Sequence, residues 1–267
     1  MSDFILFRKS RNILSSVLHV ILNVLLGVGS IILTIITGSW LLGFILVILS
    51  KWRMFAVRPR YWFLNLKSNL VDLIVGISFV LIAYCSGNTE IYFVHYLLAF
   101  LYSLWLVILK PMSSPAAASV QALTAIFLGT TAATLMSASS DSIFLVVSCF
   151  VIGYAAARHV LVQSDDSDFT IVTLACGLVS AEIAWLCHSW LIVYKFTNVP
   201  FIGNTGIIVP QLSILLSLVA FCFGTVYRSI VKHDGKLKAT EIAMPVIFSL
   251  IVAVIIIIWF SKPIFDV

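Results

Sequence analysis

Glu182 is the residue whose type and position are least expected in this sequence. It lies halfway along residues 169–193, an apolar run with no other charged residue. If that run crosses a membrane, a carboxylate there costs about 2.5–3.5 kcal/mol on insertion scales, so we expect it to face protein or a water-filled cavity. Trp185 and Ser189 follow three and seven residues later and share its helical face. We interpret the three residues as a proton or cation site in a transport path. The alternative is a protonated glutamate that hydrogen-bonds a neighbouring helix.

A second candidate site is the segment 51–69, in which basic and aromatic side chains alternate. Its cations are Lys51, Arg53, Arg58, Arg60 and Lys67, and its rings are Trp52, Phe55, Tyr61, Trp62 and Phe63. At a membrane surface such cations hold anionic headgroups while the rings reach the acyl boundary. The residues Asn65, Asn69, Asp72 and Gly76 follow at helical spacing and predict one polar stripe. We therefore expect an anionic lipid or substrate to bind here, with the asparagines and Asp72 beside the cations. The alternative is a loop that only sets the topology, with Asp72 paired to a nearby Lys or Arg.

His95 and His188 form a third constellation, because the apolar runs that hold them place both near the same membrane face. Two histidines at matched depth on different helices could ligate a haem or a metal, or move protons. Tyr92 and Tyr96 flank His95, however, and suit an ordinary interfacial aromatic belt. We therefore expect no cofactor and no metal. The acidic cluster at 165–168 matches no calcium-loop spacing, so we expect a helix cap or solvent-exposed carboxylates there.

The elements that carry these residues must lie in a membrane, because the composition suits no other solvent. Of the 267 residues, 61% are hydrophobic and only 10% are charged, and the mean hydropathy is +1.14. Soluble domains contain about 25% charged residues. The longest hydrophilic stretch, 51–69, is far too short to bury a core of its own. The sequence therefore predicts one integral membrane domain over residues 1–267, all-α and polytopic, with no soluble ATPase, kinase or dinucleotide-binding domain.

Polar residues delimit seven membrane-spanning helices. They are predicted at 70–85, 91–109, 115–136, 143–157, 169–193, 207–227 and 242–260. Residues 13–50 are uncharged and too long for one helix, so we expect two further spans, near 12–27 and 31–50, with a turn at Gly27, Gly29 and Ser30. The total is nine spans, with eight as the alternative. The apolar run is also too long for a signal peptide, so we expect it to be retained.

The distribution of basic residues favours nine spans with a cytoplasmic amino terminus. With nine spans, 14 of the 16 Lys and Arg residues fall on one face, and only Lys195 and Lys262 fall on the other. The positive-inside rule assigns the richer face to the cytoplasm. This distribution accounts for the net charge of +5 without a nucleic-acid partner.

Packing signals are present, whereas motifs for several known chemistries are not. Ala125, Gly129 and Ala133 recur every fourth residue and predict a face for close helix packing, within the chain or against a partner. The five cysteines lie singly in apolar runs and predict buried thiols. No predicted span contains a lysine, which excludes a retinal Schiff base. No H-E-x-x-H or G-x-S-x-G motif occurs.

Two segments carry a resemblance to a known group of proteins. Residues 50–62 (SKWRMFAVRPRYW), continued by Asn65, Asn69, Val71 and Asp72, and residues 153–161 (GYAAARHVL) resemble a family of multi-spanning membrane proteins from small-genome bacteria of the Saccharibacteria type. The resemblance covers most of the chain. It implies a bacterial source, hence the cytoplasmic (inner) membrane, and no mechanism, because no activity is assigned to that family.

Three functions remain open. The first is a transporter-like or lipid-handling protein, in which Glu182 binds the proton or cation and the basic segment recruits an anionic substrate or lipid. The alternative is a non-catalytic subunit or scaffold of a larger membrane assembly, or of a homo-oligomer. The third is an intramembrane enzyme that acts on lipid-linked phosphates through Asn65, Asn69 and Asp72. It ranks last because phosphoryl transfer uses metal-binding carboxylates and only Asp72 is well placed.

Overall fold

The structure, a computed structural model, describes residues 2–52, 56, 58–86, 93–108, 115–138, 141–162, 169–189, 192–196, 207–233 and 235–259. Their side chains are described from residue 17 onward, except those of Pro115, Lys195, Phe196, Ile207 and Trp259. These residues form ten α-helices, a 3-10 turn at Pro59–Tyr61 and two short strands. The helices are α1 (Ser2–Thr37), α2 (Trp40–Ser50), α3 (Trp62–Ser68), α4 (Leu70–Ser86), α5 (Phe93–Ile108), α6 (Pro115–Ser137), α7 (Ser142–Leu161), α8 (Phe169–His188), α9 (Gln211–Lys232) and α10 (Ala239–Trp259). The strands are β1 (Val193–Phe196) and β2 (Ile207–Pro210).

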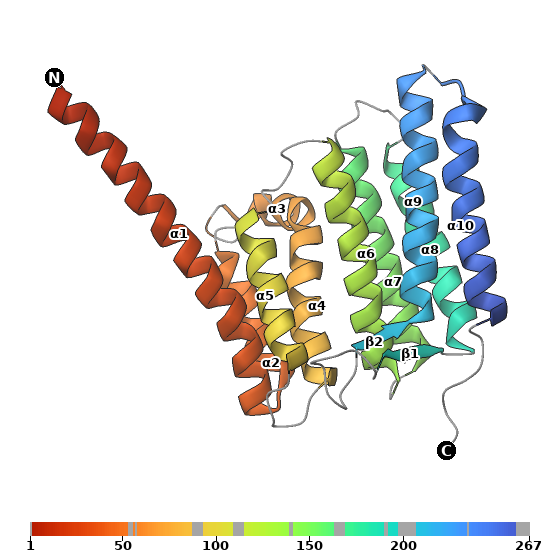
Figure 1. Cartoon of the computed structure of the whole chain (residues 1–267), viewed down its shortest axis with the longest axis horizontal. Coiled ribbons are helices and arrows are strands. Elements are labelled where there is room, and N and C mark those ends of the chain that lie inside the picture. Colours follow the sequence, from red (N-terminus) through yellow and green to blue (C-terminus); the bar gives the residue numbers. More distant parts are fainter. Residues whose placement is uncertain are drawn as a thin grey trace.

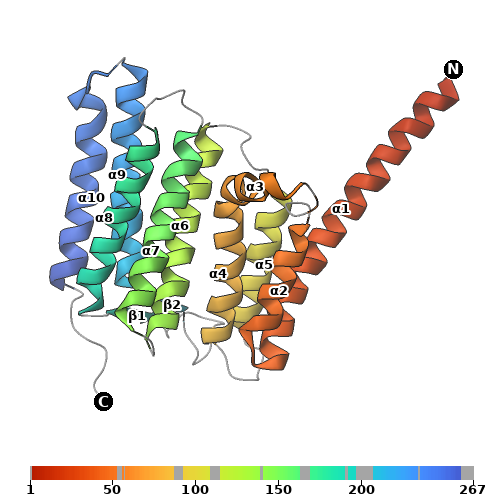
Figure 2. The same ribbon diagram turned by 180° about the vertical axis from the view of Figure 1, so that it is seen from behind.

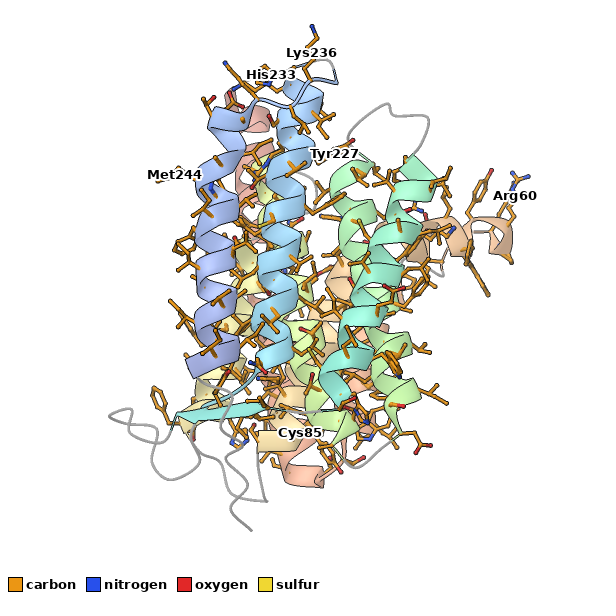
Figure 3. The ribbon with its side chains drawn as sticks, turned by 90° about the vertical axis from the view of Figure 1, so that its right-hand side faces the viewer. Arg60, Cys85, Tyr227, His233, Lys236 and Met244 are labelled. Carbon is orange, nitrogen blue, oxygen red and sulfur yellow. The ribbon has the colours of Figure 1, made fainter. Side chains whose placement is uncertain are left out.

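Helix α6 lies at the centre of the bundle and packs on α4, α7 and α9 (Figure 1). On one side α1, α2 and α5 pack around α4, and on the other α8 packs on α7 and α10 on α9 (Figure 2). Arg60, His233 and Lys236 lie toward one end of the bundle, and Cys85 lies toward the other (Figure 3). We call the first the basic end, because α3 and the α9–α10 connection lie there and both segments carry basic residues. The second, which holds β1 and β2, is the strand end.

Six helices are long and apolar enough to cross a membrane, and the bent pair formed by α3 and α4 can supply a seventh crossing. The six apolar stretches are 17–37, 116–137, 142–161, 169–188, 211–232 and 239–258. Helices α2 and α5 are apolar but shorter. Together with the exposed Leu, Ile, Val and Phe side chains on the outer faces, these helices make the chain a membrane-embedded helical bundle.

The first apolar stretch is divided at a different place from the one predicted. The predicted turn near 27–30 is wrong, because α1 runs unbroken to Thr37. The chain reverses instead at Gly38, whose φ is +59°. Ser39 then caps α2 by accepting a hydrogen bond from the Leu41 amide. Gly27 has a packing role instead. A Cβ at Gly27 would lie 2.6 Å from the Ser103 hydroxyl, so glycine lets α1 approach α5 closely.

Two predicted spans also end differently. The run 169–193 stays helical only to His188, and the run 207–227 becomes helical at Gln211. Between these points β1 and β2 pair antiparallel, with Val193 opposite Pro210 and Phe196 opposite Ile207. Their β-branched and aromatic residues favour extended backbone. Pro210 ends β2 and is the N-cap residue of α9, and it has no amide donor that would need a partner. The all-α prediction therefore needs this one strand pair added.

The predicted small-residue face lies inside the chain. Ala125 and Ala133 on α6 are buried, and a Cβ at Gly129 would lie 3.0 Å from both Ile74 on α4 and Ile152 on α7. Glycine therefore allows α6 to pack tightly on both neighbours at once. Since α6 joins the two hydrophobic clusters of the bundle, this packing unites its two sides.

Candidate functional site

A polar network joins three helices at the basic end. The Lys51 ammonium, at the carboxyl end of α2, donates to Asp72 Oδ2 in the first turn of α4. The Trp105 indole Nε1, in the last turn of α5, donates to Asp72 Oδ1 at 2.8 Å. The Lys51 and Asp72 side chains are only 22% and 24% exposed. Both carboxylate oxygens are thus engaged, and the charge of Lys51 is balanced within the protein.

This network corresponds to the pairing alternative for Asp72. It also changes the predicted anion site, because Lys51 is occupied by a carboxylate. The remaining described cations of the segment are Arg58, Arg60 and Lys67, while Arg53 lies outside the described residues.

The predicted polar stripe from Asn65 to Gly76 is wrong, because it requires one continuous helix. The chain bends by 68° between Pro59–Ser68 and α4. Asn69 stands at the bend, where its amide bonds the carbonyls of Asn65 and Leu66 and its side-chain Nδ2 donates to Asn65 O at 2.9 Å. Gly76 is covered by Tyr102, whose hydroxyl would lie 2.8 Å from a Cβ there. The four residues therefore do not line one surface.

Because of the bend, the segment around α3 exposes its aromatic side chains at the basic end. Residues 58–68 lie across the direction of α4 at the basic end, with Tyr61, Trp62, Phe63 and Leu64 all exposed. The Arg60 guanidinium lies 4.6 Å from the centre of the Tyr61 ring, and the Lys67 ammonium lies 4.3 Å from that of Phe63. These cation–π contacts hold two positive charges beside exposed rings. We call residues 58–68 the surface segment.

A buried pair that the sequence analysis missed lies between α6 and α7. His159 Nε2 lies 2.7 Å from Gln121 Oε1, and both side chains are more than nine-tenths buried. The predicted span ended at Ala157, which left His159 in a loop, whereas α7 continues to Leu161. Two polar residues at the same end of consecutive apolar helices were the signal that could have identified the pair.

Glu182 faces away from the bundle. The face of α8 that packs on α7 carries Ala181 and Ala184, whereas Glu182 is exposed and Trp185 is 61% exposed. Ser189 is exposed as well. The expectation that Glu182 faces protein or a water-filled cavity is therefore wrong for the single chain. The reason is that the smaller residues of α8 provide its packing face.

His95 and His188 do not converge. His95 is fully buried where α5 packs on α1 and α4, and it hydrogen-bonds the backbone of Ala83. His188 is the last residue of α8, on the other side of α6 (Figures 1 and 2). Among the residues that the structure describes, no three His, Cys, Asp or Glu side chains gather as metal ligands would. The acidic cluster at 165–168 lies outside them.

At the strand end, Tyr194 in β1 is buried and connects the sheet to α9. Burial raises the pKa of its phenol, and a hydrogen bond with Gln211 acts in the opposite direction. Gln211 Nε2 also donates to the Ile256 carbonyl of α10 at 3.3 Å. These contacts hold the ends of α9 and α10 against the sheet.

A groove of about 560 Å³ lies between α1 and α5, with His95 and Ser103 in its lining. Two further apolar grooves open between helices in the described part of the chain. One, of about 750 Å³, lies between α5 and α9 over α4 and α6, and Trp105 lies on its wall. The other, of about 330 Å³, lies between α8 and α9 over α6 and α7, and its lining includes Tyr227 and Arg228. We call them the α5–α9 groove and the α8–α9 groove. Both volumes are in the range of small-molecule sites, which is about 300–1,000 Å³.

No family model, curated protein or solved structure matches the chain. The resemblance to membrane proteins of Saccharibacteria-type organisms therefore gains no support from these comparisons.

Proposed function

We propose that the protein is a lipid-handling membrane protein that binds anionic lipid at its basic end. The observation that carries the proposal is the surface segment, which lies at 68° to α4 and exposes aromatic side chains next to cations. If α4 crosses the bilayer, this segment lies close to the membrane plane. Phe63 and Leu64 then reach the acyl boundary, and Arg60 and Lys67 meet the headgroup phosphates.

The proposed topology has nine crossings, by α1, α2 and α4–α10, with the amino terminus and the basic end in the cytoplasm. The alternation of these helices between the two ends supports it (Figure 1). The gathering of Lys and Arg at the basic end supports the orientation. Eight crossings is the alternative, because α2 has only 11 residues and would cross a full bilayer only with help from its flanks.

The topology can be tested by cysteine labelling in a variant that lacks the five native cysteines. Lys236→Cys at the basic end should react with a membrane-impermeant maleimide only after the cells are opened. Asp141→Cys, which precedes α7 at the other end, should react in intact cells. The reverse pattern would contradict the proposed orientation.

Anionic lipid binding can be tested by reconstitution with spin-labelled phosphatidylglycerol or phosphatidylcholine. We expect the wild-type protein to immobilise phosphatidylglycerol in preference, because each Lys or Arg near the surface contributes about 1 kcal/mol toward anionic lipid. The double variant Arg60→Gln/Lys67→Gln should reduce that preference several-fold.

The matched control is Lys236→Gln/Lys238→Gln, which removes the same charge from exposed positions at the same end. The cation–π contacts found in the described part of the chain do not involve these two lysines, so the preference should change little. Equal losses in both double variants would mean that net charge alone attracts the lipid, and would reject the surface segment as the site.

A second candidate function, a subunit of a membrane assembly, is favoured by the outward position of Glu182. A carboxylate near the bilayer centre is expensive when it faces lipid, so a neighbouring helix that hydrogen-bonds it would lower that cost. The role of Glu182 in proton or cation transport requires such a neighbour too, because Glu182 is exposed and lines none of the three grooves of the described chain. The enzymatic alternative is weaker, since both oxygens of Asp72 are already bonded.

Pull-downs of wild-type and Glu182→Gln protein from the native membrane test this alternative. Loss of a stoichiometric partner from the variant, with the fold retained, would support assembly through α8. The same partners in both samples, or none in either, would count against it. Ser142→Ala, at the half-buried first residue of α7, is the control.

A further inference from the structure

The α8–α9 groove exists because small residues face each other across it. α8 packs mainly on α7 and α9 mainly on α6, so the two helices diverge between these supports. Gly153, Ala156, Ala175, Ala220 and Gly224 are among the residues that line the gap. A Cβ at Gly224 would find no atom within 4 Å, so the gap at this position is not filled by protein.

A cation lies at the basic end of this groove. Arg228 is one turn beyond Gly224 on α9, and its Nε donates to the Gly224 carbonyl at 3.0 Å. Within the described part of the chain, no carboxylate lies within salt-bridge distance of it. The guanidinium is exposed, and among the described residues only its Nε is engaged, by the Gly224 carbonyl. Its two Nη groups can therefore donate two parallel hydrogen bonds to one carboxylate or phosphate. Tyr227 lies beside it, near the end of α9 that leads to His233 (Figure 3).

From this arrangement we propose that the α8–α9 groove binds an acyl chain whose anionic headgroup is held by Arg228. Along the helices the walls are apolar, and at the basic end they reach Arg228, which has no carboxylate partner among the described residues. The complementary ligand is an amphiphile that is apolar along its length, like the groove, and carries a negative charge at the end that meets Arg228. The inference deepens the proposed lipid-handling function and rests on it.

The α5–α9 groove lacks this complementarity. Its basic end reaches Trp105, whose indole N–H is already bonded to Asp72. A headgroup phosphate there would meet a carboxylate, and Lys51 is already paired with that carboxylate. The groove between α1 and α5 has no Lys or Arg in its lining. Charge therefore favours the α8–α9 groove for an anionic ligand, although both other grooves are larger.

The experiment uses diazirine-bearing probes and the reconstituted full chain. Photolabelled positions are mapped by peptide mass spectrometry after irradiation with phosphatidylglycerol, palmitic acid or phosphatidylcholine probes. In wild-type protein we expect the anionic probes to label Val179 and Ala220 in the groove severalfold more than the phosphatidylcholine probe does. Ile247 on the lipid-facing side of α10 reports ordinary lipid contact and should be labelled alike by all three.

Two variants test the two parts of the proposal. Gly224→Leu adds bulk at a position where a Cβ would meet no atom within 4 Å, and it should abolish labelling in the groove while Ile247 stays labelled. Gly29→Leu adds the same bulk to open space on α1 and is the matched control. Arg228→Gln should lower labelling by the anionic probes severalfold, to the phosphatidylcholine level.

Groove labelling that survives Gly224→Leu would overturn the groove as the chain-binding site. Labelling that is equal for anionic and zwitterionic probes, and insensitive to Arg228→Gln, would overturn the role of Arg228. Preference for the palmitic acid probe identifies a free fatty acid as the ligand source, and preference for phosphatidylglycerol identifies a bilayer lipid. Because Arg60 and Lys67 are intact in these variants, failure here leaves the proposed function at the surface segment standing.

Discussion

Gly153 and Gly224 are both helical glycines that line the α8–α9 groove, yet their surroundings are opposite. A Cβ at Gly153 would lie 2.2 Å from the Ser180 hydroxyl and 3.0 Å from the Cys176 carbonyl, so α7 and α8 touch there at the backbone. At Gly224 nothing lies within 4 Å. The same contrast extends to whole helices. In α6, 50% of the apolar stretch is buried inside the protein, whereas in α10 only 6% of the apolar stretch is buried.

The comparison separates a packed centre from an open rim. In the centre, α4, α6 and α7 bury small residues, hydroxyls bonded to their own helices, and the Gln121–His159 pair. At the rim, α8, α9 and α10 present apolar side chains and Glu182 outward. Packing without gaps fixes geometry, whereas divergent helices leave room for a lipid or a partner. We therefore assign the stability of the fold to the packed centre and the binding of lipid or partner to the rim.

The largest effect is expected from alanine at the two glycines. Gly153→Ala should lower the free energy of unfolding by about 1–3 kcal/mol, because overpacking would force α8 away from α7. Gly224→Ala should leave stability unchanged or raise it by up to about 1 kcal/mol, since alanine is the better helix former. Thermal unfolding in one detergent measures both. Equal destabilisation would remove the distinction between centre and rim.

A smaller effect is expected from the ion pairs that Asp72 and Glu241 form. Asp72→Asn leaves the Lys51 charge without its partner and should cost about 1–2 kcal/mol, a value reduced for partial exposure. Adding Lys51→Met should restore part of the loss. Glu241→Gln breaks the Lys232–Glu241 pair, whose lysine is 67% exposed, and should have no measurable effect. The same unfolding assay decides, and a larger loss from Glu241→Gln would reverse the ranking.

The smallest effect concerns the hydroxyl contact that joins centre and rim. Thr131 Oγ1 on α6 lies 2.9 Å from Ser213 Oγ on α9, and Thr131→Val should cost about 0.6 kcal/mol, the average for such contacts between membrane helices. Thr134→Val is the control, because in the described part of the chain that hydroxyl bonds the Thr130 carbonyl of its own helix, as Thr131 also bonds the Phe127 carbonyl, and reaches no other helix. Losses that do not differ between the two variants would show that this contact does not hold α9.

Hydropathy predicted much of the architecture and little of the site. Apolar runs bounded by polar residues place α4, α5, α6 and α10 within a few residues of their ends, because the bilayer fixes the length and polarity of a span. The turn at Gly38 was missed because three other small residues nearby offered an equally good break. Whether a glycine turns the chain or packs a helix depends on its neighbours in space.

The site depends on contacts between distant residues, which the sequence does not order. Asp72 could have paired with any nearby cation, and Lys51 and Trp105 are 21 and 33 residues away from it. Arg228 was counted only as one of the basic residues that orient the chain. Its position at the end of a groove follows from the divergence of α8 and α9, for which periodicity gives no signal. The outward face of Glu182 depends likewise on which side of α8 packs on α7.

Native mass spectrometry of the wild-type protein, extracted gently from its own membrane, tests the lipid-handling account most directly. The account predicts a single chain or a homo-oligomer that retains anionic lipid in preference to zwitterionic lipid. A complex with stoichiometric foreign subunits and no retained anionic lipid would contradict it and favour the assembly function.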